Sequence, residues 1–237
     1  YLTRADAAFA YLMNSARPYG EAGFQRSNHG AAADYSVPDE WMTRDLLMRL
    51  WACTELYAAG RTAFKDTAIM LAEEILGRQV PEVEAEDGLY GHFYLFGSKG
   101  PTEKANFHHH PGHDCGAVFP HYLFPLMDMA RRWYDHPAAP RWRETVRRFA
   151  YGYFLPACRR NPFYLLPMGI FPGSGLLDFC GPWHGANVTL AFASALATDL
   201  EGFLGDQAFR DIAVGNLQWI AGLNAGVSAD CFGGMCL

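Results

Sequence analysis

The segment FHHHPGHDCG, residues 107 to 116, holds four of the nine histidines of the chain beside one carboxylate and one thiol. Such side chains are zinc ligands, and His108 and His110 would point the same way on an extended segment, with His113, Asp114 or Cys115 completing the set. Contiguous ligands are difficult to arrange around one ion, and the chain has no HExxH or CxxC motif. We therefore predict neither a metal nor a cofactor here.

The same segment has the side chains to bind sugar hydroxyls or to move a proton. Asp114 is the candidate general base or hydroxyl acceptor, and His110 and His113 are candidate substrate-binding neighbours. A polar turn without a catalytic role is the alternative.

Two further segments, DYSVPDEW (34 to 41) and DFCGPWHGAN (178 to 187), are equally rich in polar and aromatic side chains, and each precedes a helical pattern. Helix N-termini offer free backbone N–H groups to oxygen-rich ligands. For Asp39 and Asn187 the alternative is a simple N-cap. The substrate-binding candidates in these segments are Tyr35, Asp39, Trp183, His184 and Asn187.

Glycoside hydrolysis by inversion needs two carboxyl groups about 6.5 to 9.5 Å apart. The loop carboxylates that could supply the pair are Asp34, Asp39, Glu40, Asp114 and Asp178. We take Asp114 and Asp178 as the catalytic candidates. No GxSxG nucleophile elbow and no GxxxxGK or GxGxxG phosphate loop is present.

Helical periodicity dominates the chain and predicts three pairs of helices that would position these segments. The pairs are 41 to 59 with 64 to 77, about 124 to 134 with 141 to 154, and 188 to 204 with 208 to 223. The second helices open alike, at Phe64, Trp142 and Phe209, which indicates a repeated helical hairpin. Residues 4 to 16 are typical of the second helix of an earlier hairpin.

The connections between hairpins are long, at 17 to 40, 78 to 116 and 159 to 187, and loops of such length are usually functional. Short strands are possible within residues 86 to 97 and 161 to 171. Because each long connection leads into the first helix of a hairpin, we expect all three at one end of an all-α array. The chain is expected to form one domain, 1 to 237.

The composition limits the kinds of partner that we expect the chain to bind. The chain has 237 residues, a formal net charge of -6 and no block of Lys or Arg, so we expect no nucleic acid. No apolar run reaches the roughly 20 residues needed to span a bilayer, so we expect no membrane. The six cysteines are scattered, which favours buried free thiols. One bridge, Cys231 with Cys236 or Cys115 with Cys180, is the alternative.

The run GPWHGAN (181 to 187), the helical hairpin that turns at Gly205-Asp206, and WIAGLNAG (219 to 226) together resemble the late part of glycoside hydrolase family 9. Upstream, DLLMRLWACTELY (45 to 57) is similar to a family helix in which Trp-Ala-Ala precedes Glu-Leu-Tyr. The resemblance covers about half of the chain. It implies an (α/α)6 barrel acting on a carbohydrate substrate by inversion, a secreted or periplasmic protein, and a substrate-lining role for Trp183 and Asn187.

The departures from the family are specific. The Asp-Ala-Gly-Asp motif that supplies its base would precede Tyr1, and its acid would lie beyond Leu237. His184 stands where glycine is common, and Ala225 replaces the proline of Asn-Pro. We expect an incomplete barrel in this chain. A sugar epimerase or polysaccharide lyase on the same barrel, or a non-catalytic glycan-binding scaffold, is the alternative to a hydrolase.

Overall fold

A computed structural model describes residues 1–14, 41, 43–85, 87–94, 97, 123–167, 169–170, 175–179 and 187–223. These residues are mainly helical, which confirms the all-α class. The long α-helices are α1 (Leu2–Asn14), α2 (Thr43–Ala58), α3 (Phe64–Leu76), α4 (Leu123–Arg132), α5 (Ala139–Arg148), α7 (Asn187–Leu204) and α8 (Arg210–Ile220). The shorter elements are η2 (Glu82–Glu84), η5 (Phe149–Phe154), α6 (Leu155–Cys158), β1 (Gly169–Ile170), β2 (Leu177–Asp178) and η6 (Gln207–Phe209).

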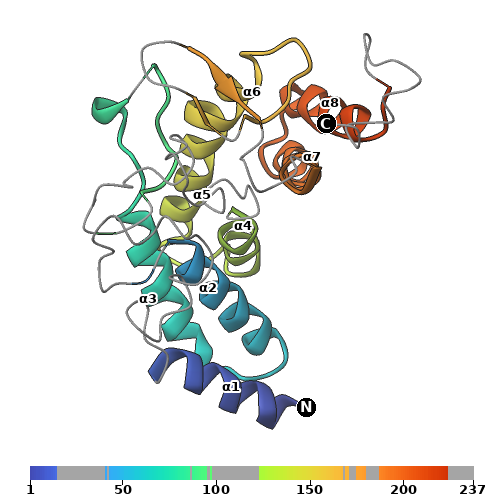
Figure 1. Ribbon diagram of the computed structural model, residues 1–237. Helices are drawn as coiled ribbons and strands as arrows, with labels where there is room; N and C mark the ends of the chain where they lie inside the picture. The colour runs from blue at the N-terminus through green and yellow to red at the C-terminus, as the bar shows by residue number, and fades with distance from the viewer. Residues whose placement is uncertain are drawn as a thin grey trace, which may run out of the picture.

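The three predicted helix pairs are present as hairpins, α2 with α3, α4 with α5, and α7 with α8 (Figure 1). Two of the turns contain a glycine at positive φ, Gly60 at 90° and Gly205 at 69°. A glycine in this conformation ends a helix without the steric cost that a Cβ would impose, so the sequence breaks each helix at that residue. The predicted helix bounds differ from the observed ones by a few residues at most.

Neighbouring hairpins lie side by side in the same direction. Contacts between α2 and α4 pair Trp51 with Phe124 and Glu55 with Arg132, so these helices are parallel. On the other layer, the contacts advance together along both segments, from Tyr151 with Asp206 through Phe154 with Phe209 to Phe163 with Trp219. The chain from η5 through α6 therefore runs in the same direction as η6 and α8. Since α7 is antiparallel to α8, all three first helices begin at the same end.

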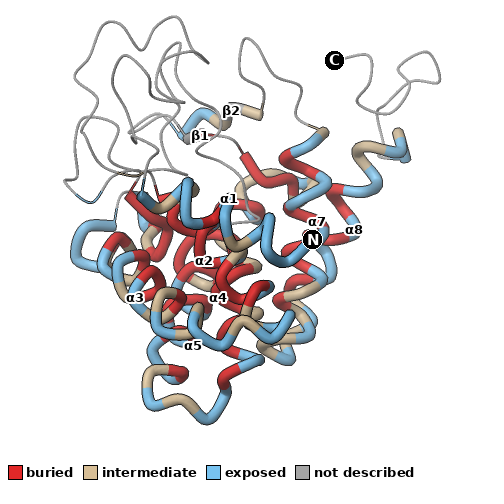
Figure 2. The backbone as a smooth tube through the Cα atoms, turned by 90° about the horizontal axis from the view of Figure 1, so that it is seen from below, coloured by how far each residue is buried: buried red, intermediate tan, exposed pale blue. Residues whose placement is uncertain are grey.

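The hydrophobic core lies between the first helices and the second helices. One cluster of buried side chains extends from Phe9 of α1 to Ala213 of α8. Leu46, Leu47 and Leu50 of α2 are almost completely buried in it. Figure 2 shows the long buried stretches of α2 and α4 at the centre of the molecule, while exposed stretches follow its outside. Apolar burial between two helical layers therefore holds the hairpins together.

Helix α1 packs against the first hairpin. Asp6 forms an ion pair with Arg61 beyond the end of α2, at 3.0 Å, whereas the carbonyl of Leu12 accepts from Arg49 in the middle of α2, at 2.8 Å. Helix α1 is therefore antiparallel to α2, which is the direction expected of the second helix of an earlier hairpin.

The second helix of the middle hairpin contains a π-helical stretch, η5, that the sequence analysis missed. Phe149 and Tyr153 pack against Phe93 and His92, with ring centroids 6.1 and 5.1 Å apart. The carbonyl of Gly152 accepts a hydrogen bond from the backbone N–H of Tyr90, at 3.1 Å. A π-turn frees such carbonyls for outside partners. The segment 87–94 is thereby bound to the helix, and a Cβ at Gly152 would lie 2.7 Å from the Tyr90 carbonyl oxygen.

Little extended structure was predicted, and little is found among the described residues. Within 86 to 97, Phe93 forms an isolated bridge with Gln79. Within 161 to 171, β1 pairs antiparallel with β2, with Gly169 opposite Asp178 and Ile170 opposite Leu177. No described helix is long and apolar enough to cross a membrane.

Candidate functional site

The first helices leave one side uncovered by the described second helices, and we call this side the shared face. Its residues recur at spacings of four and three along each helix, which places them on one side of a helix. They are Arg44, Met48, Trp51 and Glu55 of α2, Phe124, Asp128, Arg131 and Arg132 of α4, and Val188, Phe192, Ala195 and Asp199 of α7. All are exposed or half-buried.

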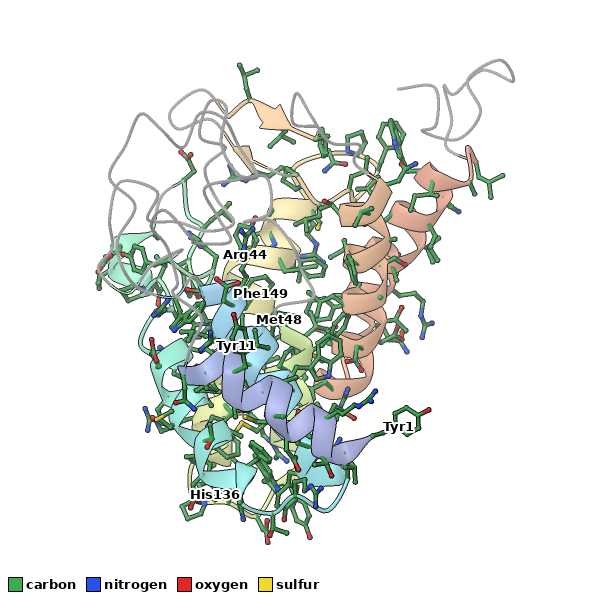
Figure 3. The ribbon with its side chains drawn as sticks, turned by 60° about the horizontal axis from the view of Figure 1, so that its bottom comes forward. Tyr1, Tyr11, Arg44, Met48, His136 and Phe149 are labelled. Carbon is green, nitrogen blue, oxygen red and sulfur yellow. The ribbon has the colours of Figure 1, made fainter. Side chains whose placement is uncertain are left out.

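Aromatic side chains lie on the half of the shared face that is closer to the helix N-termini. Trp51 is 37% exposed, and its ring centroid lies 6.4 Å from that of Phe124 on the neighbouring helix. Phe192 on α7 is also 37% exposed. Figure 3 labels Arg44 and Met48, which precede Trp51 along the same helix. Exposed flat rings of this kind offer an apolar surface to a ligand that has one of its own.

Ion pairs occupy the other half of the shared face. Arg132 bridges Asp128, at 3.1 Å, and Glu55 of α2, at 3.6 Å. Arg131 contacts Asp199 of α7 at 2.7 Å. These pairs are partly exposed, so each contributes little to the free energy of unfolding. They link the three first helices to one another. Because each carboxylate is paired with an arginine, these acids are better suited to fixing the helices in place than to transferring protons.

Two buried arginines fix the N-terminus of α2, where the segment 34 to 41 leads into the helix. The guanidinium of Arg49 lies 3.4 Å from the ring centre of Trp41. Arg78 donates to the carbonyl of Trp41, at 2.6 Å, and forms an ion pair with Glu74. Guanidinium groups suit this role because their several donors can bind carbonyls on different segments at once. The start of α2 is thus held rigidly.

Thr43 extends this network to the segment that follows α3. Its hydroxyl donates to the carbonyl of Tyr94 at 2.5 Å and accepts from Arg78 at 3.4 Å. The phenol of Tyr94 in turn donates to a carboxylate oxygen of Glu84. These residues were not among the predicted site residues. The signal in the sequence is an arginine, Arg78, placed directly after the end of a helix.

Most predicted site residues lie outside the described residues, so their predicted roles stay predictions. These are Tyr35, Asp39, His110, His113, Asp114, Trp183 and His184. Asn187 is the first residue of α7 and is half-buried, at the end where α2 also begins. Asp178 is the last residue of β2, opposite Gly169.

Other reactive groups are few in the part of the chain that the structure describes. Cys53 and Cys158 are free and buried, as predicted. Burial raises the pKa of Cys53 to about 12 and that of Cys158 well above its ordinary value, so neither is a nucleophile at neutral pH. The described residues contain no group of three or more His, Cys, Asp or Glu that could hold a metal ion.

Comparison with known proteins adds no relative, because no family model, curated protein or solved structure matches the chain.

Proposed function

We propose that this protein is a glycoside hydrolase of the six-hairpin class, in which the three hairpins form part of an (α/α)6 barrel. The observation that carries the proposal is the common direction of α2, α4 and α7. Because their N-termini lie at one end, the segments that precede them enter at that end. Every predicted site residue belongs to a segment that leads into one of these three helices.

The shared face supports a sugar as the ligand. Trp51, Phe124 and Phe192 would stack on the apolar faces of sugar rings, next to the predicted substrate-binding residues at the N-terminal end. On this proposal Tyr35, Asp39, His110, His113, Trp183, His184 and Asn187 bind the glycan. Asp114 and Asp178 supply the two carboxyl groups of an inverting mechanism, one protonating the leaving oxygen and the other activating water.

Turnover of a panel of soluble polysaccharides and oligosaccharides tests the proposal. New reducing ends without unsaturation are expected, and the first product should have the inverted anomeric configuration by proton NMR. An unsaturated product would indicate a lyase, and an unchanged chain length with an altered sugar would indicate an epimerase.

Variants separate the two catalytic candidates from the scaffold. Asp114→Asn and Asp178→Asn should each lower kcat by at least about a hundredfold. Asp66→Asn, an exposed carboxylate in the first turn of α3, is the matched control and should leave kcat unchanged. Persistent glycan binding with no turnover in the parent protein would point to a non-catalytic scaffold. Absence of both binding and turnover would overturn the proposal.

A further inference from the structure

A cleft distinct from the aromatic half of the shared face lies at the opposite end of the hairpins. Its volume is about 620 Å³, and it is formed where the ends of α4 and α7 meet the beginning of α5. The lining residues are Arg131, Pro140, Arg143, Glu144, Arg147, Gly202, Phe203 and Leu204. We call it the arginine cleft. Its size is in the range of small-molecule sites, about 300 to 1,000 Å³.

The arginine cleft carries more positive charge than its surroundings neutralise. Of its lining groups, Arg131 forms an ion pair with Asp199 at 2.7 Å, and Glu144 is bound to Arg148 at 3.1 Å. Arg143 and Arg147 form no ion pair with any described residue. This surplus lies on a chain whose formal net charge is -6, so it is local.

Nearby acidic groups do not cancel this surplus. Glu201, one residue before Gly202, is bound to Arg210. Asp206, in the turn after α7, accepts hydrogen bonds from the backbone of Ala208 and the phenol of Tyr151. Glu201 and Asp206 are thus engaged with other partners, and Arg143 and Arg147, which pair with no described acid, line the cleft.

The positions of the arginines suit the binding of an oxyanion. Arg143 and Arg147 are one turn apart on α5, so they lie on the same side of the helix and repel each other when nothing lies between them. Aromatic rings support two of the guanidinium groups, with Arg131 5.2 Å from the ring centre of Phe203 and Arg147 5.3 Å from that of Tyr151. A ring under a guanidinium leaves its N–H donors available at the edge.

We propose that the arginine cleft binds a small polyanion through phosphate or sulfate groups. Arginine forms paired, charge-assisted hydrogen bonds with the oxygens of such groups, and an anion between Arg143 and Arg147 would relieve their mutual repulsion. The proposal does not depend on the activity proposed above, because none of its lining residues belongs to the predicted catalytic or substrate-binding set.

Titration calorimetry of the full chain with sodium pyrophosphate and with a sulfated disaccharide, at low ionic strength, tests the proposal. We expect saturable binding of at least one probe that weakens as salt is added. Pyrophosphate binding alone assigns a phosphorylated ligand, and binding of the sulfated disaccharide alone assigns a sulfated one. No saturable binding of either probe overturns the proposal.

Variants localise the site. Arg143→Gln combined with Arg147→Gln should weaken binding about tenfold or more, whereas Arg4→Gln, an exposed arginine on α1, should not. A Cβ at Gly202 would meet no atom within 4 Å, so a side chain there can enter the cleft without disturbing the fold. Gly202→Glu should therefore abolish binding, and Gly202→Ala should retain it. Equal affinity in all four variants would contradict the assigned site.

Discussion

The two sides of helix α2 differ in what they do. The buried side carries Leu46, Leu47, Leu50 and Cys53. The exposed side carries Arg44, Met48, Trp51 and Glu55. The first set is apolar and nearly inaccessible, which is what packing against α3 requires. The second set mixes a cation, an anion, a thioether and a large ring, a combination that packing alone does not require. The difference teaches that the two sides of one helix can have separate roles: packing on one side and, as proposed above, ligand binding on the other.

A truncation on the buried side should have the largest effect on stability. Leu47 is completely buried, so Leu47→Ala removes apolar contacts and leaves a cavity. We expect the free energy of unfolding to fall by about 2 to 5 kcal/mol, measured by urea denaturation. Met48→Ala, the adjacent residue on the exposed side, is the control. A similar loss in both variants would remove the distinction between the two sides.

The buried side of α8 contains a polar exception that should be almost as sensitive. Asn216 is completely buried; it donates to the carbonyls of Tyr164 and Ile212, at 3.0 and 2.7 Å, and accepts from the N–H of Leu166. Asn216→Leu would leave the Tyr164 carbonyl and the Leu166 N–H without this partner and should cost about 2 to 4 kcal/mol. The same measurement on Gln218→Leu, on the exposed side of this helix, should show a change near zero.

On the exposed side, Trp51→Ala should affect ligand affinity more than folding. Loss of the ring contact with Phe124 should cost about 1 kcal/mol of stability. If the shared face binds glycans, affinity electrophoresis with soluble polysaccharides should show binding about tenfold weaker or worse. Tyr134→Ala, which removes an exposed aromatic ring outside the shared face, is the matched control. Unchanged mobility in the Trp51 variant would show that this ring does not contact glycan.

The ion pairs of the shared face should contribute least. Arg132→Ala removes the contacts with Asp128 and Glu55, whose side chains are 34% and 62% exposed. We expect a loss of about 0 to 1 kcal/mol that diminishes at high salt. A loss comparable to that of a buried leucine would mean that the exposed side also determines stability.

A pH-dependent contact at the hairpin turn gives a further small effect. Hydrogen bonds from Ala208 and Tyr151 lower the pKa of Asp206, and burial followed by the bond to Asp206 raises the pKa of Tyr151. Asp206 therefore adds to the free energy of unfolding above the ordinary carboxyl pKa, and this addition is lost as the pH falls through its lowered pKa. Tyr151 adds to the free energy of unfolding below the ordinary phenol pKa, and this addition is lost as the pH rises through its raised pKa. In Tyr151→Phe, the melting temperature should depend less on pH at both extremes.

Much of the fold could be predicted from the sequence, because hydrophobic periodicity and turn glycines act locally. The helix pairs and the free buried state of Cys53 and Cys158 were found in this way. The shared face was not, although the 44, 48, 51, 55 spacing was visible, because a side left uncovered depends on which helices become neighbours. The predictions for Asp114 and the histidines around it lie outside the described residues and stay predictions.

The two arginines that hold the start of α2 in place are a second feature that could not be predicted from the sequence. Sequence reasoning treats Arg78 and Arg49 as surface charges, because arginine is rarely buried. In the structure they are 4% and 7% exposed, and their partners are distant in sequence, including Trp41 and Leu12. Only tertiary contact explains why a charge is tolerated there.

The π-helical stretch η5 allows a single helix to contact two neighbouring parts of the molecule, the segment 87–94 and the third hairpin. An extra residue in one turn rotates everything after it by about 100° relative to a regular helix. In a regular α-helix Phe149 and Phe154 would point about 140° apart. In η5 their rings stack with centroids 6.2 Å apart, and the stack continues from Phe149 to Phe93 and from Phe154 to Phe209 of the next hairpin. One row of four stacked rings therefore joins the segment 87–94, the middle hairpin and the third hairpin.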